Sequence, residues 1–347
     1  ELLLQDPLYP GLRSHRIRGN EYDEFIEEFV DALNSVFPDI CIQWEDFAGT
    51  NAIRILEHFR EKVCCFNDDI QGTASVINSG LLTACRISGL PLEEHRFLFL
   101  GAGAAAVGIA GLLTKVLIER GSTKEEAYRN IWLFDSKGVV SKNRVGLDAH
   151  KIPFANSDIN CSSFTDAVAV IKPTAIIGLS TIRGAFSKDV IELMSSINQR
   201  PIIFPCSNPT SHSECTAEEA YVWSDGRAIF AAGSPFEPVT LGKQTYYPSQ
   251  GNNIYIFPAM GLAVFATRAK RVTDGMFIAA LHSLSEQVTE NDLEKGLIYP
   301  PIQNIRQVSA QIAIDVTKYI FEKGLAGIET PDNIESFVKQ QMYDPVY

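Results

Sequence analysis

Two pairs of acidic residues in the stretch Cys41 to Thr73 have the side chains and the spacing to bind a metal ion. Each pair directly follows a short apolar segment, the first beginning at Cys41 and the second running from Val63 to Phe66. If these segments are neighbouring parallel strands, both pairs lie at the carboxyl edge of one sheet, where open α/β sheets bind their ligands. The four acidic residues are Glu45, Asp46, Asp68 and Asp69.

Four carboxylates at one edge repel one another unless a cation or a lysine neutralises them. Hard divalent ions such as Mg²⁺ and Mn²⁺ take oxygen ligands of this kind and keep positions open for substrate oxygens. The alternative is that both pairs are solvated loop ends or helix caps, since Asp is common where a helix begins. The pattern alone leaves both interpretations open.

Hydrophobic periodicity predicts the elements that position these residues. Segment Cys41 to Gln43 is expected to be a strand, and Val63 to Phe66 a buried one. Between them, apolar residues recur at helical spacing from Asn51 to Glu61. After the second acidic pair, Gln71 to Arg86 is helical in pattern and rich in small residues, which favours close packing.

A glycine-rich turn in the segment Arg96 to Gly121 predicts dinucleotide binding. An apolar strand leads into Gly101-x-Gly103-x-x-Ala106, and a long apolar helix follows. The glycines permit a tight turn and the close approach of a pyrophosphate, and the helix N-terminus offers free N–H groups to that anion. The strand–turn–helix context makes this motif far more specific than the glycines alone.

The acidic residue after the next predicted strand is a candidate to bind the ribose. The strand Ile131 to Phe134 ends at Asp135, which is followed by Ser136. An acid alone favours NAD by bonding the ribose 2′-hydroxyl, whereas nearby lysines can hold the 2′-phosphate of NADP. The alternative for the lysines is that they are solvated loop residues. The NADP candidates are Lys137, Lys142 and Lys151.

Three later strand patterns all end in small or polar residues, which suits a ligand-binding edge. They are Ala175 to Thr181, Pro201 to Ser211, which contains Asn208, and Ala228 to Phe236. The turn from Ser249 to Ala259 then carries Asn252 and Asn253. From spacing alone, adjacent asparagines favour a turn over a ligand site. Helical patterns cover Tyr22 to Phe37, Arg271 to Val288 and Ile305 to Lys323.

Composition describes an ordinary globular protein, with 46% hydrophobic and 21% charged residues. The net charge of -12 argues against a nucleic-acid surface, and no apolar run reaches the length of a membrane span. The seven cysteines lack the spacing of a disulfide framework, and several lie in apolar stretches. Cys41, Cys64, Cys65 and Cys85 are therefore expected to be buried thiols in a reducing compartment.

Six motifs in one order carry a family resemblance: EDFAGTNA, FNDDIQGT, FLGAGAAAVG, SNPTSHSECT, GSPF and GNNIYIFPA. With these motifs the chain resembles a malic enzyme of the eukaryotic type, and the similarity covers essentially its whole length. What it resembles is the larger, carboxy-terminal part of such a subunit. Members of that family oxidise L-malate with NAD or NADP and decarboxylate the product to pyruvate and CO₂, using Mg²⁺ or Mn²⁺.

The resemblance implies a role for each matching residue. Glu45, Asp46 and Asp69 would be metal ligands, and Asp68 would pair with the catalytic lysine. Asn208, Asn252 and Asn253 would contact substrate, which replaces the turn interpretation of the last two. The implied cofactor contacts are Thr73, Gly101, Gly103, Ala104, Ala105, Ala106, Asp135, Ser136, Lys137, Asn208 and Asn253.

Two departures from the family pattern matter for activity. In the family, the general-base lysine, a tyrosine acid and a substrate-binding arginine lie upstream of the segment that begins at Glu1, and no position here matches them. The chain as given is therefore expected to show little or no oxidative decarboxylation. Ala104 stands where many members carry an acidic residue, which leaves loop packing and cofactor preference open.

The fold implied is α/β, with a Rossmann-type doubly wound parallel sheet in residues 68–253. A second α/β domain would combine residues 1–67 and 254–325, followed by a tail, 326–347. The resemblance also implies a homo-oligomer, a dimer or a tetramer, that binds neither nucleic acid nor membrane. It would be intracellular, in the cytoplasm or an organelle matrix such as that of mitochondria.

Two other functions fit parts of the pattern. A metal-free Rossmann dehydrogenase acting on a hydroxy or amino acid would leave Glu45, Asp46 and Asp69 unexplained. A truncated product that binds nucleotide or partner subunits without chemistry would fit the missing lysine.

Overall fold

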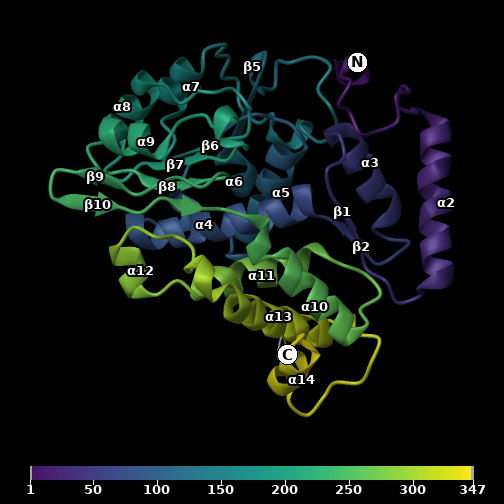
Figure 1. The fold of residues 1–347 in the computed structure, drawn as a ribbon. Coiled ribbons are helices and arrows are strands. Elements are labelled where there is room, and N and C mark those ends of the chain that lie inside the picture. The colour runs from purple at the N-terminus through teal and green to yellow at the C-terminus, as the bar shows by residue number, and fades with distance from the viewer. Residues whose placement is uncertain (1, 345–347) are drawn as a thin grey trace. The chain divides into compact units, whose positions relative to one another are not determined.

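The computed structural model describes residues 2–344 (Figure 1). The chain divides into two compact units, Glu1–Ile40 and Cys41–Tyr347. The first unit contains helices α1 (Leu2–Gln5) and α2 (Asn20–Val36). Helix α2 confirms the helix predicted from Tyr22, and its two buried residues, Ile26 and Val30, are four positions apart on one face.

The second unit holds all the strands and the remaining helices of the described residues. Its strands are β1 (Ile42–Trp44), β2 (Cys65–Asn67), β3 (Phe97–Leu100), β4 (Ile131–Asp135), β5 (Gly138–Val139), β6 (Ala175–Gly178), β7 (Ile202–Pro205), β8 (Ile229–Ala232), β9 (Val239–Leu241), β10 (Gln244–Tyr246) and β11 (Ser249–Gln250). Its helices are α3 (Gly49–Phe59), α4 (Thr73–Ser88), α5 (Ala104–Glu119), α6 (Lys124–Arg129), α7 (Phe164–Ile171), α8 (Lys188–Ile197), α9 (Ala217–Trp223), α10 (Phe257–Thr267), α11 (Asp274–Glu286), α12 (Glu290–Glu294), α13 (Ile305–Glu322) and α14 (Ile334–Gln341).

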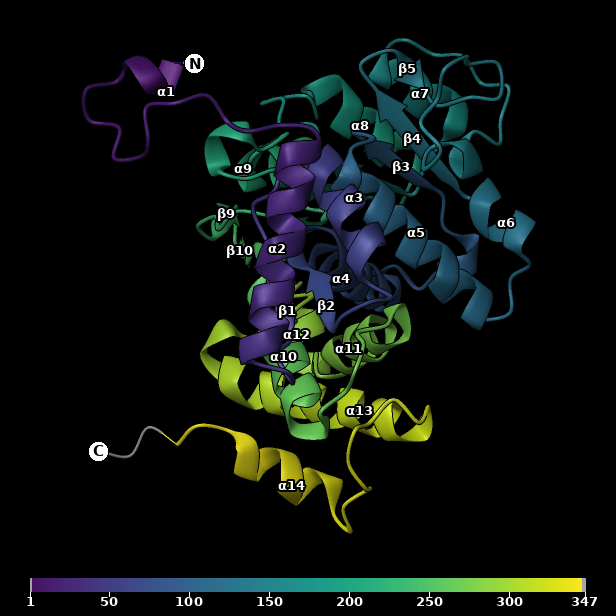
Figure 2. The same ribbon diagram turned by 90° about the vertical axis from the view of Figure 1, so that its right-hand side faces the viewer.

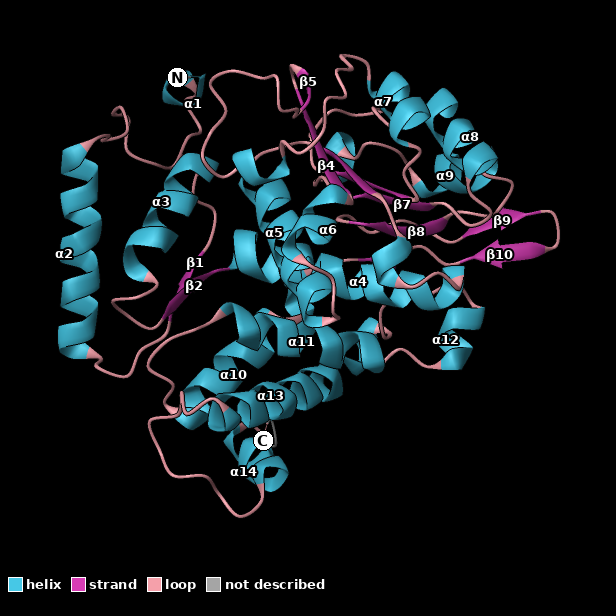
Figure 3. Ribbon diagram, turned by 180° about the vertical axis from the view of Figure 1, so that it is seen from behind, coloured by secondary structure: helices cyan, strands magenta, loops and turns pink. Residues whose placement is uncertain are grey.

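A seven-stranded sheet forms the centre of this unit, in the order β11-β8-β7-β6-β3-β4-β5 (Figure 3). Its pairs are parallel except β4 with β5. The chain passes from β3 outward to β4 and then returns to the other side of β3 with β6. This reversal is the topological switch point of a doubly wound sheet, where such folds bind ligands. The predicted Rossmann-type sheet is confirmed.

Helices cover both faces of the sheet, as the views in Figures 1 and 2 show. Alternate residues of β3 point to opposite faces. Phe97 and Phe99 join a core built with α4, α5, α10, α11 and α13. Leu98 and Leu100 join the core built with α7, α8 and α9. Because both faces are buried, the strand is apolar throughout, which is why it was identified from sequence as a continuous run.

A separate two-stranded sheet carries the acidic pairs. Strands β1 and β2 are parallel, with Ile42 opposite Cys65 and Trp44 opposite Asn67. Helix α3 connects them, so the predicted strand–helix–strand unit is confirmed. The strands end one residue later than predicted because Trp44 and Asn67 are buried and still pair.

The segment after β2 differs from the predicted helix beginning at Gln71. Residues Asp68–Gly72 form a single π-helical turn, called here the π turn, and α4 begins at Thr73. The side chain of Asn67 accepts a hydrogen bond from Ile70 N–H at 2.9 Å, and Gln71 Oε1 accepts one from Asn67 N–H at 3.0 Å. These bonds satisfy backbone donors outside the regular helical pattern and hold the wider turn.

The helical segment after Asn253 is tied back to the π turn through one half-buried carboxylate. Asp274 accepts hydrogen bonds from Arg60 at 3.0 Å and from Gln71 at 3.1 Å, and it pairs with Lys115. These contacts join Asp274 to residues on both sides of position 67. The grouping of residues 1–67 with 254–325 in one domain, and the boundaries at 67 and 253, stay predictions. None of the helices between residues 2 and 344 is long and apolar enough to cross a membrane.

Gly101, which directly follows β3, has a backbone conformation that other residues rarely adopt. Its φ is 124°, and a Cβ there would lie 2.5 Å from the carbonyl oxygen of Leu179. We predict that Gly101→Ala lowers the free energy of unfolding by more than about 2 kcal/mol, from strained backbone and overpacking.

The matched control is Gly111→Ala, where a Cβ within α5 would meet no atom within 4 Å. It is expected to raise stability by about 0.5–1 kcal/mol, because alanine favours helix over glycine. Thermal and urea unfolding of both variants measure the difference, and equal effects would contradict the assigned role of Gly101.

Candidate active site

The two predicted acidic pairs lie together at the carboxyl ends of β1 and β2. The backbone N–H of Asp46 donates to Asp69 Oδ2 at 2.8 Å. Glu45 accepts a hydrogen bond from Gln43 at 2.9 Å, and its charge acts on Asp68. Asp46 has a φ of 63°, a left-handed conformation that turns the chain back towards the second pair. The prediction that both pairs share one edge is confirmed.

Asp68 is the buried member of this group. Its Oδ2 accepts a hydrogen bond from Asn253 at 3.0 Å, while Oδ1 has no hydrogen-bond partner. The pKa of Asp68 is raised to about 7, because burial and the charges of Glu45 and Asp69 raise it more than the Asn253 bond lowers it. A Cβ at Gly72 would overlap Oδ1, so the carboxylate is packed directly against the π turn.

The acidic residues offer the oxygen ligands of a hard-cation site, although their carboxylates do not point at one common position. Among the described residues, no three His, Cys, Asp or Glu side chains form a metal-binding group. Burial also raises the pKa of Asp69, and no lysine or arginine contributes to the pKa of either aspartate. An orphaned oxygen and uncompensated carboxylates fit Mg²⁺ or Mn²⁺. Glu45, Asp46 and Asp69 therefore stay predicted ligands.

Asn253 joins the acidic group to the first turn of α4. Its Nδ2 donates to Asp68 Oδ2 and lies 3.1 Å from Thr73 Oγ1, and its Oδ1 lies 3.2 Å from the same hydroxyl. Asn252 behaves differently, because its Oδ1 accepts a hydrogen bond from Ile254 N–H at 2.9 Å and caps a short helical turn. The turn interpretation describes Asn252, whereas Asn253 lies with Asp68 and Thr73.

The glycine-rich turn lies at the switch point, beside the π turn. Gly101 N–H donates to the carbonyl of Phe134 at 2.7 Å, and α5 begins directly after Gly103. A Cβ at Gly108 would lie 2.8 Å from Ile70, so this glycine lets α5 pack closely on the π turn. Ala104 packs in a small apolar cluster around Ala52, Leu56 and Ile70. The free N–H groups of the first turn, at Ala104, Ala105 and Ala106, are suited to bind a pyrophosphate.

The predicted ribose acid, Asp135, is already paired with cations. Arg144 binds both its oxygens, at 2.8 and 3.0 Å, and Lys151 Nζ lies 3.5 Å from Oδ2. These cations and the Lys137 N–H bond lower the pKa of Asp135 against the opposing effect of burial. Arg144 was not identified from the sequence, although the basic run around it offered a signal. Ser136, Lys137 and Lys142 are exposed.

A second residue missed by sequence reasoning is Glu214. It is fully buried, and its carboxylate accepts hydrogen bonds from Ser180 N–H at 2.8 Å, Ser180 Oγ at 2.9 Å and Ser207 Oγ at 2.6 Å. Ser207 Oγ in turn accepts from the N–H of Thr181, whose φ is 58°.

This network explains why two strands are shorter than predicted. The backbone donors of Ser180 and Thr181 are bonded to side chains and leave the sheet, so β6 ends at Gly178 rather than Thr181. Strand β7 likewise ends at Pro205. Asn208 follows it, exposed at the same edge, and forms a cis peptide bond with Pro209.

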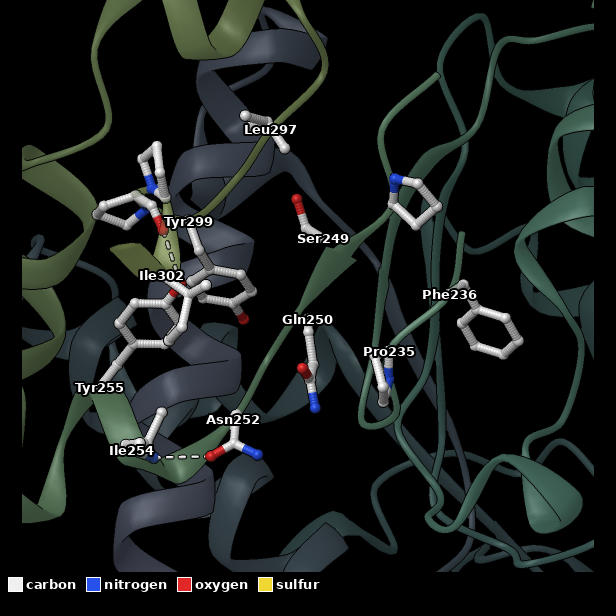
Figure 4. Close-up of a pocket in the computed structure, with 13 residues that line it drawn as sticks. Pro235, Phe236, Ser249, Gln250, Asn252, Ile254, Tyr255, Leu297, Tyr299 and Ile302 are labelled. Carbon is white, nitrogen blue, oxygen red and sulfur yellow. Dashed lines mark hydrogen bonds between the residues drawn. The ribbon is translucent and has the colours of Figure 1, made fainter. Parts of the chain in front are cut away.

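A cavity of about 390 Å³ lies beside the Asn252 turn (Figure 4). Gln250 and Asn252 extend their amides towards it, and Tyr255 and Tyr299 stack at 5.7 Å between ring centroids. Its lining, among the described residues, includes no charged side chain. The described residues that line the cavity are therefore all neutral.

Comparison with known families matches both parts of this arrangement. Residues 70–321 match the model described as "Malic enzyme, NAD binding domain", and residues 1–60 match "Malic enzyme, N-terminal domain". The chain belongs to the malic enzyme family. The first match includes the glycine-rich turn and Asp135, so the chain carries the NAD-binding domain of this family. The family expected from the six motifs is confirmed.

Two curated relatives show how much of a subunit is present. The NADP-dependent malic enzyme of Homo sapiens is 48% identical over 350 residues, covering 100% of this chain and 61% of the relative. The chloroplastic NADP-dependent malic enzyme of Oryza sativa subsp. japonica is 47% identical and is covered to 55%. The chain thus spans about three fifths of the length of the human relative.

Solved malic enzymes share the fold. The enzyme of Entamoeba histolytica is 25% identical with a TM-score of 0.74, covering 92% of this chain and 62% of that structure. The enzyme of Pyrococcus horikoshii is 25% identical with a TM-score of 0.69, covering 98% of this chain and 73% of that structure. These likenesses confirm the α/β architecture, whereas the roles of individual site residues stay predictions.

The buried Asp68 predicts a pH-dependent stability. Its pKa rises from 3.8 to about 7 on folding. The stability linked to its bound proton is therefore fully present below about pH 4 and is lost as pH rises through 7. We expect Asp68→Asn to be more stable than the parent at pH 8 without divalent ions, by up to about 4 kcal/mol. The difference should vanish near pH 4.

Thermal unfolding between pH 4 and pH 8 in EDTA measures this difference. The control is Asp332→Asn at an exposed position, which should leave the pH profile unchanged. A stability difference between the parent and Asp68→Asn that is the same at both pH values would contradict a buried, uncompensated carboxylate.

Proposed function

We propose that this chain is the metal- and nucleotide-binding part of an NADP-dependent malic enzyme, which converts L-malate to pyruvate and CO₂. The proposal rests on one juxtaposition. Asp68, Asn253 and Thr73 contact one another at the end of β2, and the close contact of Ile70 with Gly108 brings the glycine-rich turn beside them. A cation bound by the carboxylates and a dinucleotide bound at α5 would thus lie close enough to contact the same substrate molecule.

The acidic group would hold the metal through Glu45, Asp46 and Asp69. When bound, a divalent ion supplies Lewis acidity at the substrate oxygens and stabilises negative charge during decarboxylation. Asp69 is oriented by the N–H of Asp46 at 2.8 Å, which fixes one of its oxygens. Asp68 is too buried to be solvated, so it favours a positive neighbour, such as the catalytic lysine that the resemblance implies.

The neutral amides complete the site. Asn253 is held by Asp68 and Thr73, and we assign its amide to contact a substrate carboxylate or the nicotinamide. Asn208 follows β7, and its neighbour Ser207 is held by a hydrogen bond to the buried Glu214. Hydrogen bonds from neighbouring side chains hold such residues in the geometry that catalysis requires. The bound nicotinamide supplies the hydride acceptor.

The surroundings of Asp135 favour NADP over NAD. A carboxylate already bound at both oxygens by Arg144 is poorly placed to accept the ribose 2′-hydroxyl. Arg144 and Lys151 instead offer two cations beside the position of a 2′-phosphate. The relatives named as NADP-dependent support the same choice.

The reaction itself needs a base and an acid, which we assign to the part of the relatives that this chain does not span. We also propose that the whole protein is a homo-oligomer, as the family resemblance implies. The chain as given should then bind Mn²⁺ and nucleotide without turnover.

Turnover is the direct test of this function. We expect no NADPH from the 347-residue chain with L-malate and Mn²⁺. The same chain, extended by the segment that the resemblance places before Glu1, should form NADPH and lose this activity in EDTA. Asp69→Asn in the extended protein should lower kcat by more than about 100-fold through loss of a metal ligand.

Asp332→Asn in the extended protein is the control and should retain full activity. Turnover that persists in EDTA would contradict the metal assignment. Turnover by the unextended chain would show that its own residues supply the base.

Cofactor choice is tested by binding alone. Lys151→Gln and Arg144→Gln should each weaken NADP⁺ binding about 10- to 100-fold, because each removes a charge-assisted contact to phosphate. NAD⁺ binding should change little. Lys243→Gln, at an exposed position outside this region, is the control. Calorimetric titration with both nucleotides measures this, and an equal loss for NAD⁺ and NADP⁺ would exclude the 2′-phosphate role.

A further inference from the structure

Two thiols face each other across the small sheet that carries the acidic pairs. Strands β1 and β2 are in register from Ile42 opposite Cys65, and Ile42 N–H donates to the carbonyl of Cys64 at 2.9 Å. Cys41 and Cys64 precede these residues and therefore lie opposite each other on the same face. The two thiols are close enough for each to shift the pKa of the other. Both residues are half-buried, and both thiols are free.

The two sulfurs have unequal reactivity. The interaction with Cys41 lowers the pKa of Cys64 against the opposing effect of burial, whereas the same interaction and burial raise the pKa of Cys41. Cys64 is therefore the better nucleophile, because the thiolate is the species that attacks a disulfide. Cys41 is positioned to attack second.

The other five cysteines lack this arrangement. Cys65, Cys206 and Cys215 are buried. Cys85 and Cys161 are half-buried like the pair, but burial raises the pKa of each thiol, and for Cys85 to about 12. Neither has a second cysteine among the groups that act on its pKa. The sequence predicted that Cys41, Cys64, Cys65 and Cys85 are buried. This holds for Cys65, whereas the other three are half-buried.

We propose that Cys41 and Cys64 are a reversible modification site, which exchanges with a low-molecular-weight disulfide to form an intramolecular disulfide between β1 and β2. The Cys64 thiolate attacks one sulfur of the small disulfide, forms a mixed disulfide and releases one small thiolate. Cys41 then loses its proton, attacks Cys64 Sγ and releases the second small thiol. The two cysteines lose two electrons, and the small disulfide is reduced to two thiols.

The position gives this bond a defined structural effect. Cys41 stands four residues before Glu45, and Cys64 stands four residues before Asp68. The disulfide would close a loop through α3 and covalently fix the two strands whose ends carry the acidic group. Closing a loop of this kind restricts the unfolded chain, so the oxidised protein should resist unfolding more than the reduced one.

The test uses oxidised glutathione as the probe, with no requirement for activity. The reduced chain is incubated with excess oxidised glutathione, and thiols, intact mass and linked peptides are measured. We expect loss of two of the seven thiols, a mass lower by about 2 Da and a peptide linking Cys41 to Cys64. Dithiothreitol should restore both thiols.

Single variants separate the two steps. Cys41→Ser should stop at a stable glutathione adduct on Cys64, and Cys64→Ser should react at least tenfold more slowly at Cys41. Cys161→Ser is the control and should form the disulfide at the parent rate. Thermal unfolding of each reduced variant checks that the fold is retained.

Modification of Cys85 or Cys161 at the same rate as Cys64 would overturn the proposal. Glutathione adducts on the parent that never resolve into the linked peptide would also overturn it. Because the readout is thiol chemistry, these outcomes are independent of whether the chain is part of a malic enzyme.

Discussion

The close approach of α5 to the π turn is the contact on which the candidate site depends. Gly108 has no side chain, so Ile70 can pack directly on the helix that starts at the glycine-rich turn. The same π turn carries Asp68 and Asp69 at its start. One packing contact therefore sets the spacing between the region suited to an anion and the region suited to a cation. Any side chain at Gly108 would move the two apart.

Four carboxylates in this fold are removed from water in different ways. Asp274 is neutralised by Arg60 and Lys115, and Asp135 by Arg144 and Lys151. Glu214 is held by serine hydroxyl and backbone N–H donors. One oxygen of Asp68 accepts a hydrogen bond from the Asn253 amide, and the other has no hydrogen-bond partner. The first three are satisfied within the described residues, whereas Asp68 retains a capacity for a positive partner, which distinguishes a functional carboxylate from structural ones.

The positions of residues that directly follow an apolar strand could be predicted from the sequence. The acidic pairs and Gly101 each end an apolar run, so the parallel geometry of the sheet places them at its carboxyl edges. Arg144 and Glu214 could not be found this way, because their partners come from separate elements and no local pattern marks the contact. Asn252 and Asn253 are chemically identical neighbours. Only the path of the chain decides that the first caps a turn and the second contacts Asp68.

The Asn253 contact also has a consequence for how the protein folds. Asn253 and Asp68 are 185 positions apart, and the Gln71–Asp274 bond spans 203. Contacts of this range form late, because the entropy of closing a long loop opposes them until the intervening sheet exists. During synthesis the acidic pairs emerge well before the segment that completes their surroundings. The site is thus assembled last, and its completion reports that the whole doubly wound sheet is in place.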